Sequence, residues 1–161
     1  MVKSSFPDSF ADCIVTLNVL EHIESDIAAL NQIRRMLKKG GIAIIEVPAG
    51  PALYDSFDFS VGHYRRYTMR ELETKINKAN MRILSKSHLG FVTYPAFWLL
   101  KKKNQLVSRY SASPKEKIVL KTIRTGRSSN ALHHLFSFER KLRNSFYLPI
   151  GARCLVTAIA E

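Results

Sequence analysis

The sequence of 161 residues has little cysteine, no long apolar run and few acidic residues in its second half. Its two cysteines, Cys13 and Cys154, both sit inside apolar stretches, which predicts buried free thiols and argues against a fold built on disulfides. No stretch approaches the ~20 apolar residues that a membrane-spanning helix needs, and the short polar start of the chain does not have the pattern of a secretion signal. We therefore expect a protein of the reducing cytoplasm.

Acidic residues are unevenly distributed along the chain. Residues 1–60 carry 5 Lys and Arg against 8 Asp and Glu, whereas residues 61–161 carry 20 against 5, within a net charge of +12. Such a surplus indicates an anionic neighbour: nucleic acid, an acidic membrane surface, or an acidic or phosphorylated substrate. A solvated basic face that keeps the protein soluble explains the same pattern. Because the sequence has no recognised nucleic-acid-binding motif, we predict that nucleic acid is not the partner.

A strand, a helix and a second strand come first in the predicted structure. Residues 10–20 form a nearly continuous apolar run rich in β-branched side chains, which is typical of a strand buried on both faces. The helix begins at Glu24 or Ser25 and ends in basic residues followed by the pair Gly40–Gly41. Residues 42–47 form the second strand. This order predicts a βαβ unit with parallel strands and a right-handed crossover.

The rest of the chain is predicted to form one domain, 1–161, with an insertion. Residues 49–67 form a long connection whose aromatic and charged content argues against disorder. Thr68 then begins a helix in a T-x-x-E capping box with Glu71. Further elements follow in the order strand 81–92, helix 94–110, polar basic stretch 111–129, helix 131–146 and strand 152–160. Residues 94–147 are thus expected to be a helical, basic insertion or lid between the last two strands.

Three motifs in this order carry a resemblance to a known family. They are FPDSFADCIVTLNVLEHI at 6–23, IRRMLKKGGIAIIEVPA at 33–49 and GHYRRYTMREL at 62–72, and LPIGARCLVTAIA closes the chain at 148–160. Together they resemble the second half of class I S-adenosylmethionine-dependent methyltransferases, in particular a bacterial group with a strand-end LEH and a downstream GHxRRY. The resemblance implies direct methyl transfer from S-adenosylmethionine to a small-molecule or lipid-linked acceptor.

The resemblance also implies an α/β fold with a partial Rossmann-like methyltransferase sheet, flanked by helices. Residues 10–20, 42–47, 81–91 and 152–160 correspond to strands 4, 5, 6 and 7 of that sheet, in the spatial order 4-5-7-6 with the last strand antiparallel. Strands 1–3, the glycine-rich cofactor turn and the ribose-binding acidic residue have no counterpart. Strand 10–20 would then be an open edge that a missing amino-terminal half, a partner chain or a second copy covers.

Cofactor contacts are implied where the first strand ends. In the family this corner touches S-adenosylmethionine mainly through backbone atoms, and for Asn18 a ligand contact and simple loop structure both remain open. Some relatives have a Glu-x-x-Glu-His cluster here that resembles a divalent metal site, but Asn18 stands where the first Glu would be. Since hard cations prefer carboxylate oxygens, we predict no metal site at Glu21 and His22. The predicted cofactor-binding residues are Leu17, Asn18, Val19 and His22.

The segment 62–67 (GHYRRY) is implied to lie on the rim where the acceptor approaches. His63 is the candidate base for an acceptor that must lose a proton, since its charge changes near neutral pH. Anchoring of the loop by hydrogen bonds is the alternative for His63 and Tyr67. Arg65 and Arg66 either clamp an anionic acceptor or form ion pairs at the helix start. The predicted substrate-binding residues are Arg65, Arg66 and Tyr67.

The helix predicted over 94–110 has two interpretations. Its apolar residues, including Phe97, Trp98 and Leu99, can pack inward as a lid while Lys101–Lys103 face outward. Alternatively, a basic amphipathic helix with a tryptophan can lie at a membrane surface, which would make the protein peripheral. At the level of function, a methyltransferase competes with a non-catalytic chain that completes a partner's sheet along strand 10–20.

Overall fold

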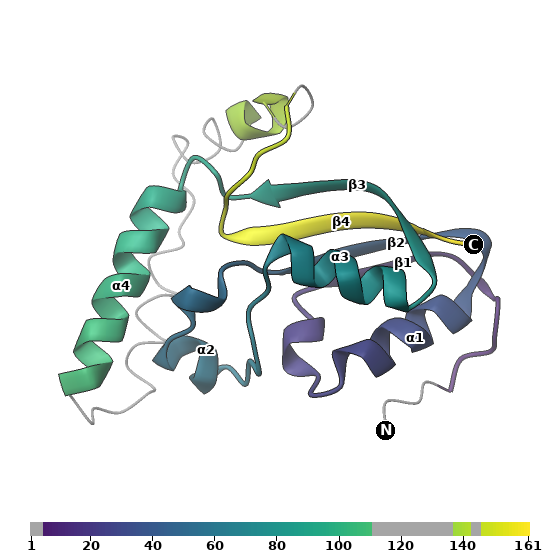
Figure 1. Cartoon of the computed structure of the whole chain (residues 1–161), viewed down its shortest axis with the longest axis horizontal. Helices are drawn as coiled ribbons and strands as arrows, with labels where there is room; N and C mark the ends of the chain where they lie inside the picture. Colours follow the sequence, from purple (N-terminus) through teal and green to yellow (C-terminus); the bar gives the residue numbers. More distant parts are fainter. Residues whose placement is uncertain (1–4, 111–136, 143–145) are drawn as a thin grey trace.

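The computed structural model describes residues 5–110, 137–142 and 146–161, which form a four-stranded sheet with helices (Figure 1). The strands are β1 (Ala11–Leu17), β2 (Leu37–Pro48), β3 (Met81–Leu89) and β4 (Arg153–Ala160), and their order in the sheet is β1-β2-β4-β3. Strand β1 is parallel to β2, whereas β4 is antiparallel to both β2 and β3. The predicted α/β class and the antiparallel last strand between the second and third strands are confirmed.

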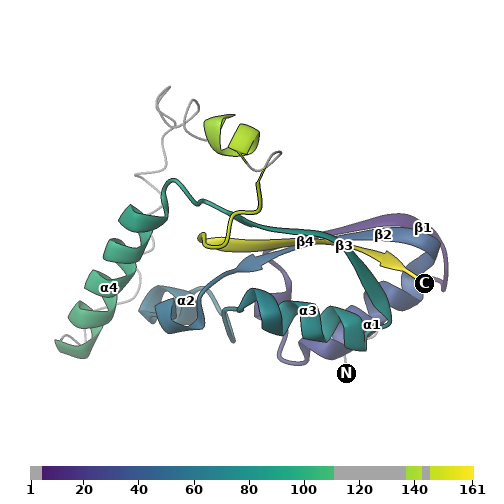
Figure 2. The same cartoon turned by 45° about the horizontal axis from the view of Figure 1, so that its top comes forward.

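Helices α1 (Asp26–Met36) and α3 (Met69–Lys78) lie side by side on one face of the sheet (Figures 1 and 2). Each helix turns a stripe of apolar residues toward the strands because those residues recur every three or four positions. The core of the described part consists of these residues and every second residue of β2 and β4. Its fully buried members include Leu30, Leu72, Ile76, Ala43, Ile45, Val156 and Ala158. Burial of this stripe is the main stabilising contribution to the fold.

Strand β1 is an edge strand, and the prediction that it is buried on both faces is wrong. Val15 and Leu17 are 54% and 52% exposed, because side chains alternate along a strand and Ile14 takes the side that packs against the core. Cys13 is exposed as well, which corrects the predicted buried thiol there, whereas Cys154 is buried and free as expected. Burial raises the pKa of the Cys154 thiol to about 12, so it stays protonated at neutral pH.

The first helix ends earlier than the sequence indicates. It stops at Met36, and the backbone is already extended at Leu37, whose side chain is fully buried in the core. Of the basic residues expected at its end, Arg34 and Arg35 lie in the last turn of α1, whereas Lys38 and Lys39 belong to the start of β2. The glycine pair lies inside that strand, where Gly40 has a positive φ of 79°.

The connection after β2 contains short helical segments. They are a 3-10 turn at Pro51–Leu53 and helix α2 (Ser56–Ser60), and another 3-10 turn, Leu20–His22, follows β1. At the start of α3, the Thr68 hydroxyl accepts a hydrogen bond from the Glu71 backbone N–H, which is the Thr68 half of the predicted capping box. These turns bring both connections to the carboxyl ends of β1 and β2.

Helix α4 (Tyr94–Tyr110) has the bounds that the sequence predicts and stands beside one end of the sheet (Figure 1). Residues 137–142 are helical, which agrees with part of the helix expected over 131–146. The remainder of that predicted helix and the stretch 111–129 lie outside the described residues. Among the described helices, none has the length and apolar character required to cross a membrane.

Candidate active site

A cavity of about 310 Å³ opens where the carboxyl ends of β1 and β2 meet the loop 49–67 and helix α4. In open α/β sheets ligands bind beyond the carboxyl ends of the strands, so this is the expected place for a site. The lining includes the end of β1, the end of β2, the GHYRRY segment and α4. Its polar members are Asn18, His63, Arg66, Lys101, Asn104 and Arg153.

The fully buried carboxylate of Asp58 is the central acceptor beneath this cavity. Arg66 donates to both of its oxygens, with Nε 2.9 Å from Oδ2 and Nη2 2.8 Å from Oδ1. The Lys101 ammonium lies 2.8 Å from Oδ2, and the Asp55 backbone N–H donates to the same oxygen at 3.1 Å. Burial alone would raise the pKa of Asp58, but the hydrogen bonds from Arg66 and Lys101 outweigh it and hold this pKa well below its usual range.

His63 is oriented by Asp58. Its Nδ1 lies 3.0 Å from Asp58 Oδ1, and because an ionised carboxylate only accepts, Nδ1 carries the proton of this hydrogen bond. Nε2 of the neutral ring is then left as a basic nitrogen, and the side chain is 13% exposed at the cavity. Burial lowers the pKa of His63 from its ordinary 6.5, and the nearby Asp58 carboxylate opposes this shift only in part. The neutral, basic form is therefore the dominant one at neutral pH.

Glu21 lies on the Nε2 side of the His63 ring, with both carboxylate oxygens buried and without a hydrogen-bond partner among the described residues. The shortest approach is 3.9 Å, from Oε1 to Nε2 of His63. Burial raises the pKa of Glu21, because a charged carboxylate without partners is costly in such surroundings. Together with His22, these residues offer one ligand atom each within 4.8 Å, a donor set that a metal ion could use. Our prediction of no metal site stays a prediction.

Helix α4 agrees with the predicted orientation only in part: Phe97 and Leu100 line the cavity and Lys103 is exposed, as expected, but other residues differ. Lys101, expected outside, is 4% exposed and binds Asp55 Oδ1 and Asp58 Oδ2, each at 2.8 Å. Trp98 and Leu99, expected inside, are exposed. The reason is that the acidic capping box of α2, in which Asp55 and Asp58 cap each other's backbone N–H groups, needs a cation at close range.

Two of the predicted substrate-binding residues do not line the cavity. Arg65 binds Asp26 Oδ2 at 3.0 Å and the Glu24 backbone oxygen at 2.6 Å. The buried Tyr67 hydroxyl donates to Asp26 Oδ2 at 2.9 Å. Arg66 does line the cavity, yet its guanidinium is held by Asp58 and by the Ala49 carbonyl at 3.1 Å. The contacts of these three side chains anchor the loop 49–67 to α1 and α2.

The predicted cofactor-binding residues lie at the end of β1. Asn18 lines the cavity with a positive φ of 53°, and its backbone N–H donates to the Glu46 carbonyl at 3.0 Å. Leu17 and Val19, on either side of it, are exposed. His22 is exposed, with Nδ1 3.3 Å from the Gly62 carbonyl and its ring packed edge-on against that of His63, with 4.6 Å between the ring centres. The structure thus brings His22 and His63 together.

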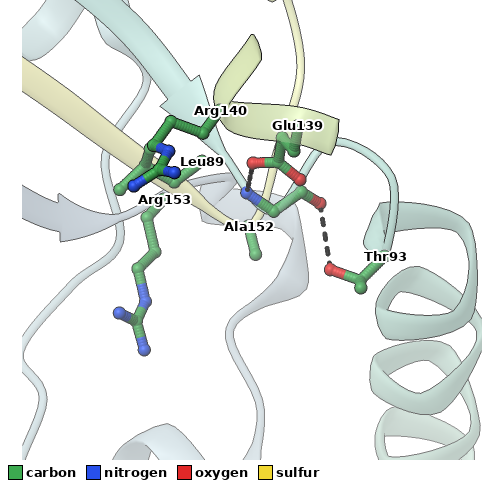
Figure 3. Close-up of a pocket in the computed structure, with 7 residues that line it drawn as sticks. Leu89, Thr93, Glu139, Arg140, Ala152 and Arg153 are labelled. Atoms are coloured by element: carbon green, nitrogen blue, oxygen red, sulfur yellow. Dashed lines mark hydrogen bonds between the residues drawn. The ribbon is translucent and has the colours of Figure 1, made fainter. Parts of the chain in front are cut away.

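A second cavity of about 390 Å³ shares a wall with the first (Figure 3). Glu139, from the helical residues 137–142, accepts hydrogen bonds from the backbone N–H groups of Gly90 at 2.6 Å and Val92 at 3.2 Å. Ala152 and Arg153 line both cavities. The carboxylate of Glu139 thereby ties the insertion to the end of β3.

Several residues of this site were not singled out from the sequence. Asp55 and Asp58 form a D-x-x-D capping box, a local pattern that sequence inspection could have found ahead of the short helix. The pairing of Asp58 with His63, five residues later, depends on the turn between them. Lys101 and Arg153 reach the site only through tertiary packing, and no sequence spacing indicates them.

Comparison with known proteins identifies the fold. In the solved structures, an S-adenosylmethionine-dependent methyltransferase of Thermotoga maritima matches 99% of this chain over 60% of its own length, with 14% identity and a TM-score of 0.57. The YcgJ protein of Bacillus subtilis matches 99% of this chain over 68% of its own length, with 14% identity and a TM-score of 0.55. The [4+2]-cyclase SpnF matches 98% of this chain over 52% of its own length, with 18% identity and a TM-score of 0.54. At such identities these structures establish the fold alone.

This chain spans 60% and 52% of the lengths of the Thermotoga protein and SpnF, so it corresponds to part of such proteins. No curated protein matches the sequence. A family model described as a methyltransferase domain matches residues 2–113, which is more than half of the chain and includes the strand ends, the GHYRRY loop and α4. The chain therefore belongs to the methyltransferase domain family.

Proposed function

We propose that this chain carries the acceptor side and one cofactor wall of an S-adenosylmethionine-dependent methyltransferase, with His63 as the base. The observation that carries the proposal is the Asp58–His63 pair at the wall of a cavity beyond the carboxyl ends of β1 and β2. S-adenosylmethionine supplies an activated methyl group on its sulfonium sulfur. The protein's task is to hold the acceptor in line with that group, which contributes up to roughly 7–11 kcal/mol of barrier reduction in favourable cases.

The residues at the end of β1 fit one side of the cofactor. Asn18 offers an exposed amide that can both donate and accept, and Leu17 and Val19 offer exposed apolar surface beside it. These residues lie at the strand end where ligands of open α/β sheets bind. The glycine pair Gly40–Gly41 lies at the beginning of β2, so it does not supply the glycine-rich cofactor turn, which follows a strand. The residues at the end of β1 therefore fit one wall of a cofactor-binding site.

His63 has the geometry of a base for an acceptor hydroxyl or amine. The acceptor proton passes to Nε2 while Nδ1 keeps its hydrogen bond to Asp58, which stabilises the imidazolium that forms. The acceptor is proposed to be a small or lipid-linked molecule. Arg153 supports an anionic group on the acceptor, because its side chain is about half exposed and lines both cavities, while it binds Glu46 Oε1 at 2.7 Å.

Calorimetric titration with S-adenosylmethionine tests this function directly. We expect saturable binding that the substitution Leu17→Asp weakens, because a charge beside the cofactor wall is unfavourable there. The substitution Leu84→Asp, at an exposed position of β3, is the matched control and should leave binding unchanged. Absence of binding to the chain and to any assembly that contains it would exclude the catalytic role.

A second function, completion of a partner's sheet, is supported by the open edge of β1. Its exposed Val15 and Leu17 form an apolar face next to edge backbone groups that no other described strand pairs. We propose that a further polypeptide segment, from a partner chain or a second copy, pairs along β1. Sedimentation velocity should show an assembly that Val15→Lys dissociates and Leu84→Lys does not. A monomer whose Val15 amide exchanges hydrogen at the rate of an unstructured peptide would contradict pairing.

A further inference from the structure

Helix α4 turns Lys101 and Gln105 toward the protein and presents several large apolar residues on its opposite side. On the inner side, Lys101 binds Asp55 and Asp58, and Gln105 donates to the carbonyls of Ala52 and Tyr54, both at 2.9 Å. On the outer side Trp98, Leu99 and Leu106 are 41%, 62% and 57% exposed. The ion pairs of the inner side fix this orientation, so the exposed apolar face is a feature of the native packing.

The outer residues form one continuous stripe. Leu99, Lys102 and Leu106 recur at spacings of three and four, which places them on the same side of the helix, and Trp98 and Lys103 flank them. Nζ of Lys102 lies 6.0 Å from the centre of the Trp98 ring. Helices that lie in a membrane interface combine large apolar side chains, tryptophan among them, with lysines, and a lysine beside an apolar stripe can extend its ammonium group to water.

The charge of this region indicates which kind of lipid surface the helix would bind. Residues 94–110 contain three lysines and one arginine and no acidic residue. Across the insertion, residues 94–147 contain 12 Lys and Arg against 2 Asp and Glu. Lysines near an anionic bilayer are attracted to its surface potential, and their aliphatic stems can lie along the apolar layer while the ammonium groups stay in water.

We propose that the outer face of α4, defined by Trp98, Leu99, Lys102, Lys103 and Leu106, docks on an anionic lipid bilayer. The helix lies flat in the headgroup region and does not cross the membrane, in agreement with its length and composition. Phe97, Leu100 and Lys101 of the same helix line the cavity of about 310 Å³, so docking places that cavity at the lipid surface. Membrane binding goes beyond the proposed methyl transfer and does not require it.

The experiment uses the full chain and its single tryptophan, Trp98, as an internal reporter. The protein is mixed with vesicles of phosphatidylglycerol and phosphatidylcholine in equal parts, or of phosphatidylcholine alone. We expect a blue shift of Trp98 emission, quenching by bromine-labelled lipid chains and sedimentation with the anionic vesicles only. Binding should weaken as salt is added, because ions screen the lysine–phosphate attraction.

Two pairs of substitutions separate the contributions of charge and apolar contact. Lys102→Glu with Lys103→Glu should reduce vesicle partitioning at least about 25-fold, since each lysine contributes about fivefold. Leu99→Asn with Leu106→Asn should abolish the blue shift. The control pair is Lys39→Glu with Leu84→Asn, exposed positions on β2 and β3, and it should bind as the parent does. Circular dichroism confirms that each variant is folded.

Certain results would overturn membrane docking. One is a Trp98 emission spectrum that anionic vesicles leave unchanged. Another is vesicle sedimentation that both α4 pairs leave intact, which would assign binding to another surface. A concentration-dependent dimer that Leu99→Asn with Leu106→Asn dissociates, without any vesicle binding, would assign the face to a second copy of the chain. None of these readouts depends on S-adenosylmethionine, so failure here is distinct from failure of the proposed function.

Discussion

The ammonium of Lys101 and the carboxylate of Asp58 meet at 2.8 Å in a buried environment, and this contact joins helix α4 to the loop that carries His63. The pair belongs to a network in which Lys101 also binds Asp55 and Arg66 also binds Asp58, so two cations face two carboxylates. A buried ion pair contributes little net stability, but removing one partner leaves the other charge uncompensated. The position of helix α4 is therefore coupled to the position of the candidate base.

Substitution of Lys101 should destabilise the fold strongly. We expect Lys101→Met to lower the free energy of unfolding by about 3 kcal/mol, because Asp55 loses its ammonium partner and Asp58 loses one of two cations. Urea denaturation followed by circular dichroism measures this. Lys102→Met, one residue along and more exposed, is the matched control and should stay within about 0.5 kcal/mol of the parent. Equal effects of the two substitutions would contradict the buried network.

His63 should titrate below 6.5, because burial lowers its pKa. Proton NMR of the ring, with the signal assigned through its loss in His63→Gln, measures this value. If His63 is the base, the methyl transfer rate rises with pH through that pKa, since only the neutral ring accepts a proton. His63→Gln should then lower kcat by about 10²–10⁴-fold with little change in cofactor affinity. A titration midpoint above 6.5 would show that the Asp58 carboxylate raises the pKa of His63 by more than burial lowers it.

Glu21→Gln should stabilise the protein at neutral pH. The pKa of Glu21 is raised above its ordinary 4.5 in the folded state, so folding favours the protonated form and stability is lost as pH rises past the unfolded value. An amide of the same shape removes this loss. Thermal unfolding should show a higher Tm for Glu21→Gln at pH 7 and no difference at pH 4. A lower Tm at both pH values would show that the carboxylate has a stabilising partner.

Tyr67→Phe should weaken the anchor of the GHYRRY loop. The hydroxyl donates to the Asp26 carboxylate, and hydrogen bonds to charged groups contribute about 1.5–3 kcal/mol, so we expect a loss of this size in the free energy of unfolding. Tyr64→Phe, at an exposed ring three residues earlier, is the control and should leave stability unchanged. If both substitutions are neutral, Lys75 and Arg65 suffice to hold Asp26.

Local patterns in the sequence predicted much of the fold. The apolar periodicity of α1 and α3, the Thr68 cap and the apolar runs of β2 and β4 are short-range signals, and the resemblance supplied the order of the strands. The end of α1 was predicted too late because Leu37 is drawn into the core, an effect of tertiary packing that overrides the basic residues after it. The burial of Lys101 and the exposure of Trp98 and Leu99 in α4 were missed for a similar reason.

The candidate site could be predicted only in part. His63 and Asn18 line the cavity, as their strand-end and loop positions led us to expect. Arg65 and Tyr67 instead bind Asp26, a residue that lies about forty positions earlier and has no sequence signal for this role. Lys101 was assigned to solvent because lysines are rarely buried, and the acidic pair that holds it becomes apparent only in three dimensions.

The position of β4 between β2 and β3 has a consequence for how the protein is made. Among the described residues these two strands have no pairing with each other, and β4 supplies the ladder on both sides. During synthesis the four-stranded sheet thus cannot close until β4 has left the ribosome. Until then the apolar faces of α1, β2 and α3 lack part of their packing, so the nascent chain is exposed to aggregation for longer than one whose strands pair in sequence order.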